Sequence, residues 1–296
     1  IDLQNKKKIL NLKIYNSIVL QMGKLSRDRR DIYYRRAKQE GFRARSAYKL
    51  IQIDEKYNIF DKVTRAVDLC AAPGSWSQVL STKLLNNSEY NEGQPKETDQ
   101  IDSNNGEAPL IVAVDLQEMA PIYGVNIIKG DITSQLTVSR ILEYFQGKKA
   151  DLVLCDGSPD VTGLHDIDEY IQNQLLVSSL SITSKIMRKG GTFVAKIFRG
   201  ENISRIYQQM FCYFELVDCC KPESSRNSSL EAFIVCRYFK FDDQDSTNVN
   251  FEIPDPLTVP FISCGDLSEY DPDKTYETEY TSSLEPIQPP INAPYH

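Results

Sequence analysis

The chain has 296 residues, of which 41% are hydrophobic and 25% are charged, a composition typical of a globular protein with a substantial core. No apolar run approaches the roughly 20 residues needed to span a bilayer, so we expect no membrane association. The seven Cys show no metal-ligand spacing, and the two His are His165 and His296. We therefore expect no metal site and a reducing, cytoplasmic environment.

The net charge of −7 conceals a segregation of charge along the chain. Residues 22–50 carry ten Lys/Arg against three Asp/Glu, a net +7. Residues 86–109 carry one against six, a net −5, and residues 242–296 carry one against twelve, a net −11. The basic segment favours an anionic partner. The alternative is a solvated helical face, and charge alone leaves both interpretations open.

Composition also divides the chain into segments. We hypothesise that Met22 is the functional start and that residues 1–21, rich in Ile, Leu, Asn and Lys, are an N-terminal extension or a gene-model artefact. The domain is expected at residues 22–241, with a polar, low-complexity insertion at 86–109 that forms a surface loop. Residues 242–296 form an acidic tail that is expected to end without structure, although its segment VPFISCGDLSEYD is apolar enough to pack on something.

Two helices are predicted first in chain order. A basic helix runs from Asp28 to Lys38 and is broken by Gly41, and a second starts near Ser46, whose hydroxyl can cap it, and continues towards Tyr57. Strands and helices then alternate. The strands are predicted at 65–69, 110–115, 126–128, 151–155, 191–197, 214–219 and 232–239, and the helices at 76–85, 134–145, 168–187 and 204–211.

This alternation predicts an α/β fold, a Rossmann-like one with a mostly parallel, seven-stranded sheet and helices on both faces. The connection between the last two predicted strands, residues 220–231, is too short for a crossover helix. We therefore expect the last strand to be antiparallel. Ligands of such sheets bind at the carboxyl ends of the strands, so the residues that follow each strand are the candidates for a site.

The first candidate is the segment DLCAAPGSWSQ, residues 68–78, where a strand runs through small residues into a helix. Small residues let the backbone approach a ligand closely, and a helix N-terminus offers free N–H groups to a carboxylate. The amino-acid part of S-adenosylmethionine carries such a carboxylate. The loop is not a GxGxxG motif, which weakens a nicotinamide interpretation. An ordinary tight strand-to-helix turn is the alternative.

Two acids strengthen the cofactor interpretation. Asp115 ends the second strand, where such folds hold adenosine hydroxyls, and Asp131 closes the next strand, where it can accept a hydrogen bond from the adenine amino group. Either acid alone could be a helix cap. Together with the loop they predict an S-adenosylmethionine site.

The later strand ends carry candidate catalytic residues. Asp156 follows the fourth strand, Lys196 lies inside the apolar run GGTFVAKIF, and Glu231 opens the last strand. A buried Lys needs a partner or a lowered pKa, unless it snorkels at a sheet edge. If burial and a nearby cation such as Lys49 lower its pKa, Lys196 could deprotonate a ribose 2′-hydroxyl.

The motifs SAYKL, DLCAAPGSWSQ, DGSPD, GGTFVAKIF and SSRNSSLEAF, in this order over about residues 24–240, resemble the FtsJ family of ribose 2′-O-methyltransferases. The resemblance implies an S-adenosylmethionine-dependent enzyme of Rossmann-like methyltransferase fold. It also implies a catalytic tetrad with Lys196 as the base, namely Lys49, Asp156, Lys196 and Glu231. The cofactor residues that it implies are Gly74, Trp76, Asp115, Asp131 and Asp156. The insertion at 86–109 departs from the family pattern.

Within that family, the segments DVTGLHDIDEY, AKIFRG and KPESSRNSSLEAF resemble the eukaryotic branch that methylates riboses of the tRNA anticodon loop. The resemblance implies a partner subunit of WD-repeat or armadillo-like type that presents the tRNA. Two alternatives stay open: a ribosomal RNA or mRNA cap ribose methyltransferase of the same fold, and a catalytically silent RNA-binding scaffold. The intact tetrad argues against the scaffold.

The basic segment is the candidate RNA-binding surface. Arginines interleave there with aromatic residues, and phosphate contacts combined with base stacking are how single-stranded RNA is held. The alternative is that Tyr33 and Tyr34 pack the helix on the core. We expect replacement of Arg43 and Arg45 by Glu to abolish tRNA methylation while cofactor binding survives. The predicted RNA-binding residues are Arg27, Arg29, Arg30, Arg35, Arg36, Arg43 and Arg45.

Overall fold

A computed structural model of the chain describes residues 31–85, 108–159, 164–200, 202–242, 259–266, 268, 270–274 and 276. The expectations for residues 1–21, for most of the 86–109 insertion and for Arg27, Arg29 and Arg30 lie outside the described residues.

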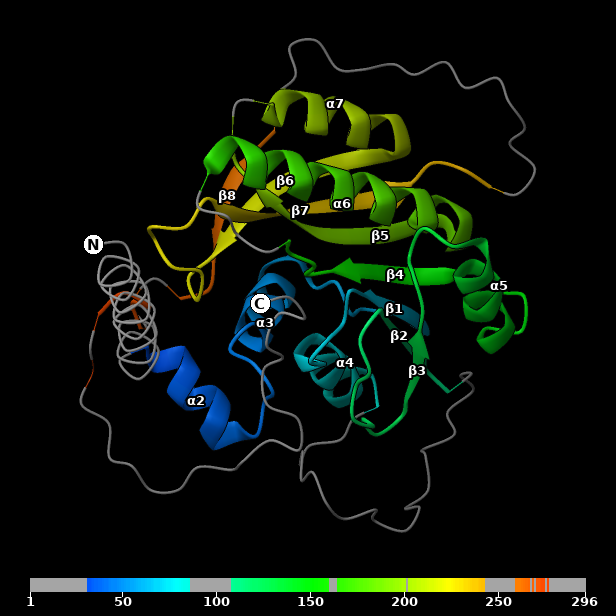
Figure 1. The fold of residues 1–296 in the computed structure, drawn as a ribbon, viewed down its shortest axis with the longest axis horizontal. Coiled ribbons are helices and arrows are strands. Elements are labelled where there is room, and N and C mark those ends of the chain that lie inside the picture. The colour runs from blue at the N-terminus through cyan, green and yellow to red at the C-terminus, as the bar shows by residue number, and fades with distance from the viewer. Residues whose placement is uncertain are drawn as a thin grey trace, which may run out of the picture.

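The fold is built on one sheet whose strands lie in the order β3-β2-β1-β4-β5-β7-β6-β8 (Figure 1). The five strands from β3 to β5 are mutually parallel, and β7 is antiparallel to both of its neighbours, β5 and β6. The predicted mostly parallel sheet with β7 antiparallel is therefore confirmed. The strands are β1 (Arg65–Leu69), β2 (Leu110–Asp115), β3 (Val125–Lys129), β4 (Ala150–Cys155), β5 (Met187–Phe198), β6 (Phe214–Pro222), β7 (Glu231–Phe239) and β8 (Phe261–Cys264).

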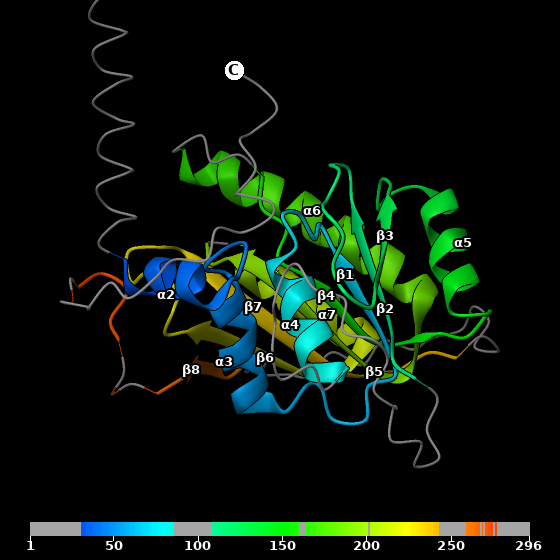
Figure 2. The same cartoon turned by 90° about the horizontal axis from the view of Figure 1, so that it is seen from below.

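Helices cover both faces of the sheet, because alternate strand residues point to opposite sides. Val67 and Val153 face a core shared with α5, α6 and α7, whereas Ala66 and Leu152 face a core shared with α3 and α4. Figure 2 shows α2 beside α3, at the end of the sheet where β8 lies. The helices are α2 (Ile32–Glu40), α3 (Ala47–Tyr57), α4 (Ser75–Leu84), α5 (Gln135–Tyr144), α6 (His165–Ile186) and α7 (Ile203–Tyr213).

The expected number of strands, seven, is wrong, because the described residues contain an eighth strand. β8 comes from the acidic tail and pairs in parallel with β6, with Cys219 opposite Phe261 and Pro222 opposite Cys264. Its four residues are too few to show a period-2 pattern within an acidic, Pro-rich segment. The segment VPFISCGDLSEYD does pack on the domain, since Cys264 is fully buried.

The start of α3 differs from the expectation in one respect. Ser46 precedes the helix, but its side chain makes no capping hydrogen bond. The Ser46 Oγ atom lies 2.7 Å from Ser75 Oγ instead, and its carbonyl oxygen accepts a hydrogen bond from Trp76 Nε1 at 2.8 Å. Ser46 therefore ties α3 to the start of α4. The described part of the preceding helix, α2, starts at Ile32, with Asp31 as its N-cap.

No helix within the described part of the chain is both long enough and apolar enough to cross a bilayer.

Candidate active site

The loop between β1 and α4 requires glycine at position 74. Gly74 has φ = +112°, in the left-handed region that side chains disfavour. A Cβ there would lie 2.7 Å from Ile122 Cδ1 and 2.9 Å from Arg43 Nη1. Gly74 is also the N-cap of α4, without a side-chain cap, so the first amides of the helix point towards the loop and can receive an anion.

Asp115, at the end of β2, holds this loop in place. Its Oδ2 atom accepts a hydrogen bond from the Ala72 N–H at 2.9 Å, and its Oδ1 atom accepts one from the Gln117 N–H at 2.8 Å. A carboxylate has about four acceptor positions. The remaining positions can accept hydrogen bonds from sugar hydroxyls, so the loop and Asp115 fit the amino-acid and adenosine parts of S-adenosylmethionine.

The other predicted cofactor residues are placed less directly. Asp131 is exposed, and its Oδ1 atom accepts hydrogen bonds from the N–H and Oγ1 of Thr133, both at 2.8 Å, which lower the pKa of the carboxyl. The Trp76 ring is 2% exposed and packs 5.6 Å from the Phe233 ring. The indole of Trp76 therefore belongs to the core, and only its backbone can line the cofactor loop.

Arg43 does not lie on an RNA-binding surface, which corrects that prediction. Its side chain is 1% exposed, and its guanidinium donates hydrogen bonds at 2.9 Å to the carbonyl oxygens of Pro73, Ala120 and Pro121. It thereby joins the cofactor loop to the loop that follows Asp115. A planar guanidinium with five N–H donors suits this task, and nothing in the spacing of GFRARSAYKL distinguishes it from a surface arginine.

Arg45 and Arg35 are also engaged within the protein. Arg45 pairs with the buried carboxylate of Asp31 and donates to the Ser224 carbonyl oxygen. Arg35 is 9% exposed and donates to the Tyr276 carbonyl oxygen at 2.7 Å. These internal contacts argue against their assignment to RNA, which stays a prediction. Phosphate contacts need accessible guanidinium groups, whereas these two guanidinium groups contact other residues of the protein.

The remaining residues of the basic segment divide between surface and core. Arg36 stays partly exposed, 3.4 Å from Glu40 and above the Tyr48 ring. Tyr33 is fully buried against Tyr48 at a ring distance of 5.4 Å. The packing interpretation of this tyrosine is therefore confirmed.

The four predicted catalytic side chains meet at the carboxyl end of β4 and the neighbouring strands. Lys196 Nζ lies 2.7 Å from Asp156 Oδ1 and 3.5 Å from Glu231 Oε2. Lys49 Nζ, from α3, lies 2.6 Å from Glu231 Oε1. The antiparallel pairing of β5 with β7 produces this meeting, because it sets Phe198 opposite Glu231 and Lys196 opposite Phe233. The result is a chain of alternating charges from Asp156 to Lys49, which we call the tetrad.

The electrostatics of the tetrad differ from the expectation. Burial alone would lower the pKa of Lys196, but the Asp156 and Glu231 carboxylates outweigh it and raise the pKa above its usual range. Burial would likewise raise the pKa of Glu231, but Lys49 and Lys196 hold it well below its usual range. The predicted lowering of the Lys196 pKa is therefore wrong, because the two carboxylates that face the ammonium outweigh its burial.

Three supporting residues have no signal in the sequence pattern. The buried Gln172 donates from Nε2 to the carbonyl oxygens of Gly157 and Lys196, at 3.1 and 3.0 Å. Ser225 Oγ donates to Glu231 Oε1 at 2.5 Å. Lys221 Nζ donates to the Ser229 and Glu231 carbonyl oxygens at 2.7 and 3.1 Å. Each fixes the backbone or the carboxylate on which a tetrad side chain depends.

Asp68, the first residue of the segment DLCAAPGSWSQ, lies fully buried in β1 below the cofactor loop. Its Oδ2 atom accepts a hydrogen bond from Ser77 Oγ at 2.6 Å. Burial raises the pKa of Asp68 to about 7 despite that bond. The carboxyl is therefore neutral below this pH and gives α4 a polar attachment to the first strand.

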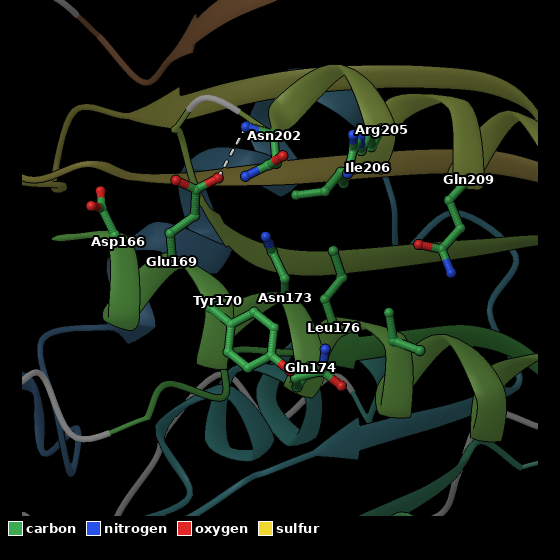
Figure 3. A pocket seen from close by; sticks show the side chains of 11 residues that line it. Asp166, Glu169, Tyr170, Asn173, Gln174, Leu176, Asn202, Arg205, Ile206 and Gln209 are labelled. Carbon is green, nitrogen blue, oxygen red and sulfur yellow. Dashed lines mark hydrogen bonds between the residues drawn. The ribbon is translucent and has the colours of Figure 1, made fainter.

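A separate hollow lies between α6 and α7 on one face of the sheet (Figure 3), with a volume of about 430 Å³. Glu169 in its wall accepts a hydrogen bond from the Asn202 N–H at 3.1 Å, and Tyr170 and Arg205 are exposed beside it. No member of the tetrad lines it. The chemistry of the tetrad therefore takes place elsewhere.

Comparison with known proteins gives one consistent result. Residues 42–239 match the family described as FtsJ-like methyltransferase. A mouse protein named tRNA (cytidine(32)/guanosine(34)-2′-O)-methyltransferase is 48% identical over 93% of this chain and 85% of its own length. A Schizosaccharomyces pombe protein of the same name is 48% identical over 93% of this chain and 95% of its own. A Plasmodium falciparum crystal structure, assigned as a ribosomal RNA methyltransferase, aligns with a TM-score of 0.56 and 26% identity over 67% of this chain and 98% of that one.

Proposed function

The chain belongs to the FtsJ-like methyltransferase family, and we propose that it methylates ribose 2′-hydroxyls in the anticodon loop of tRNA. It is an S-adenosylmethionine-dependent enzyme. The observation that carries the proposal is Lys196, an almost fully buried ammonium held between two carboxylates beside the cofactor loop. Burial of a charge is costly unless the charge is paired, and a buried titratable group with specific charged partners is a candidate functional group.

The chemistry divides between cofactor and protein. When bound, S-adenosylmethionine would supply a methyl group on a positively charged sulfur, which would be the leaving group when the ribose oxygen takes the methyl carbon. The protein has to orient the 2′-hydroxyl and take up its proton. Lys196 Nζ is the acceptor of that proton and therefore has to be neutral beforehand. Asp156 fixes the position of Nζ, through its carboxylate at 2.7 Å and its carbonyl oxygen at 3.0 Å.

Glu231 and Lys49 complete the arrangement as charge-balancing groups. Glu231 stays ionised because both lysines lower its pKa, and it links the two ammonium groups through separate oxygen atoms. Lys49 would be left without its ion-pair partner if Glu231 were removed. We propose that these two residues set the protonation state of Lys196 and do not react themselves.

The substrate assignment is supported by the relatives. Proteins about 48% identical over nearly the whole chain are named for methylation at nucleotides 32 and 34 of tRNA. The direct test is transfer of a labelled methyl group from S-adenosylmethionine to tRNA, to ribosomal RNA and to capped mRNA. We expect label in the anticodon loop of tRNA. Label in ribosomal or cap RNA alone would establish the alternative substrate, and no transfer to any RNA, with cofactor bound, would indicate the silent scaffold.

We also propose a separate partner subunit, of WD-repeat or armadillo-like type, that presents the tRNA in the cytoplasm. The burial of Arg35 and Arg43 and the ion pair of Arg45 with Asp31 support it, because the basic segment offers fewer cations to RNA than its composition indicates. The test is to purify the chain from its own cells and to compare its methylation rate with and without the co-purifying protein. A full rate for the chain alone would contradict the proposal.

A further inference from the structure

The structure contains a cavity of about 590 Å³ directly beside Glu231, on the side away from the cofactor loop. We propose that this cavity binds the nucleotide next to the methylated one, with its phosphate on Arg199 and Lys221 and its base on Phe261. The inference rests on the proposed function, because it requires RNA as the substrate. The volume is within the range of about 300–1,000 Å³ that small-molecule sites occupy.

The cavity is continuous with the tetrad through its wall. Glu231 contributes to both, and Lys221 Nζ donates to the Glu231 carbonyl oxygen at 3.1 Å. The Arg199 N–H donates to the Leu230 carbonyl oxygen at 2.9 Å. The same pairing of β5 and β7 that places Glu231 near Lys196 therefore places Arg199 at the neighbouring position. An RNA strand whose reacting ribose lies at Lys196 would therefore place its next nucleotide along this wall of the cavity.

Arg199 has the geometry of a phosphate ligand. Its guanidinium carbon lies 3.9 Å from the centre of the Phe261 ring, and its side chain is exposed. A guanidinium stacked in this way directs its N–H groups sideways, within its own plane. Among the described residues, no carboxylate forms an ion pair with Arg199. Its donors can therefore serve an anion.

Lys221 adds a second cation at the edge of the cavity. Its ammonium has three donors, of which two are used for the Ser229 and Glu231 carbonyl oxygens. Burial lowers the pKa of Lys221, and repulsion from Arg199 and Lys49 acts in the same direction, whereas the attraction of Glu231 and Asp273 opposes it. Cations that repel one another at the edge of a cavity are stabilised when a phosphate binds between them.

The lining of the cavity also includes exposed apolar side chains. Phe261 is 49% exposed and Leu230 is 45% exposed, an unusual position for two large hydrophobic side chains beside a charged cluster. Aromatic rings next to cations are how unpaired bases are held without readout of their sequence. Phe261 is the first residue of β8, so the C-terminal tail contributes to the site through this strand.

The experiment measures KM for RNA and Kd for S-adenosylmethionine in the full chain, with its partner subunit if one co-purifies. We expect Arg199→Gln to raise KM for an anticodon stem-loop about ten-fold and to leave cofactor Kd and kcat unchanged. The slope of log KM against log salt concentration should fall by about 0.7, as for the loss of one phosphate contact to a single strand. Arg205→Gln is the matched control, since Arg205 is an exposed arginine that lines the other hollow.

Phe261 is tested by two variants, because Phe261→Ala could loosen β8. Phe261→Leu keeps apolar packing and removes the stacking ring, so it should raise KM several-fold at an unchanged melting temperature. Phe261→Tyr keeps an aromatic ring and should retain the wild-type KM. Equal KM values for wild type, Arg199→Gln and Phe261→Leu would overturn the cavity assignment. If wild type methylates another RNA instead of tRNA, the same variants are measured on that RNA, which separates failure of the cavity from failure of the tRNA proposal.

Discussion

Two buried cations, Arg43 and Lys196, lie on either side of the cofactor loop and have opposite kinds of partner. Arg43 donates to three neutral carbonyl oxygens, whereas Lys196 faces two carboxylates. A guanidinium stays charged at any accessible pH and its fork fixes several acceptors at once, whereas an ammonium is a point charge that can lose a proton. The Arg43 guanidinium is therefore suited to holding a loop and the Lys196 ammonium to proton transfer, although the two side chains are buried to nearly the same extent.

Removal of Lys196 should abolish most of the catalysis without affecting the cofactor loop. We expect Lys196→Ala to reduce kcat by about 10³-fold, within the range of 10²–10⁴ for loss of a general base. Cofactor Kd, measured by calorimetry, should change little. Lys196→Arg should not restore the rate, since an arginine cannot become neutral. A wild-type rate in the Ala variant would remove Lys196 as the base.

Removal of Arg43 should destabilise the protein and the cofactor loop. Arg43→Met leaves three carbonyl oxygens without their donor, and we expect the free energy of unfolding in urea to fall by about 3 kcal/mol and cofactor binding to weaken. The expectation that Arg43→Glu spares cofactor binding is therefore reversed. Arg36→Met is the control from the same segment. Its side chain is partly exposed, so a change below about 1 kcal/mol is expected, and equal effects of the two variants would contradict the comparison.

A change to Glu231 alters the partners of Lys196 and leaves those of Arg43 intact. The raised pKa of Lys196 predicts that kcat/KM, which reports the free enzyme, increases with pH up to the limit of RNA stability. Glu231→Gln removes one attractive charge, so the pKa of Lys196 falls. The pH–rate profile should move to lower pH by about one unit or more. An unmoved profile would show that another group is titrating.

The smallest effect is expected at Asp68, a buried carboxyl without a cation. The pKa of Asp68 is raised to about 7 in the folded chain, so the folded state binds more protons than the unfolded one between about pH 4 and pH 7. The stability that this provides is fully present below the unfolded pKa and is lost as pH rises through 7. Wild type should therefore lose about 1.4 kcal/mol between pH 6 and pH 8 that Asp68→Asn does not lose. Urea titrations at both values of pH provide the measurement.

Local pattern in the sequence was enough to predict the order of the elements and the residues at the strand ends. Period-2 and period-3.6 patterns located the first seven strands and the helices within a few residues, and Asp115, Asp156 and Glu231 were recognisable as acids at strand ends. This succeeds because side-chain alternation and strand-to-helix turns are properties of short segments. The meeting of Lys196 with Asp156 and Glu231 then follows from the parallel order of β4 and β5 and the antiparallel pairing of β7.

Which charged side chains are buried, and which groups they contact, follows from the tertiary structure and not from the local sequence. Arg43 and Arg36 stand seven residues apart in one basic segment, yet Arg43 bonds to carbonyls as far along the chain as Pro121, whereas Arg36 pairs within its own helix. The direction of the Lys196 pKa likewise depends on how closely two carboxylates approach, and β8 becomes visible only through its pairing with β6. Such contacts join distant segments, and their geometry is set by packing, which no local pattern records.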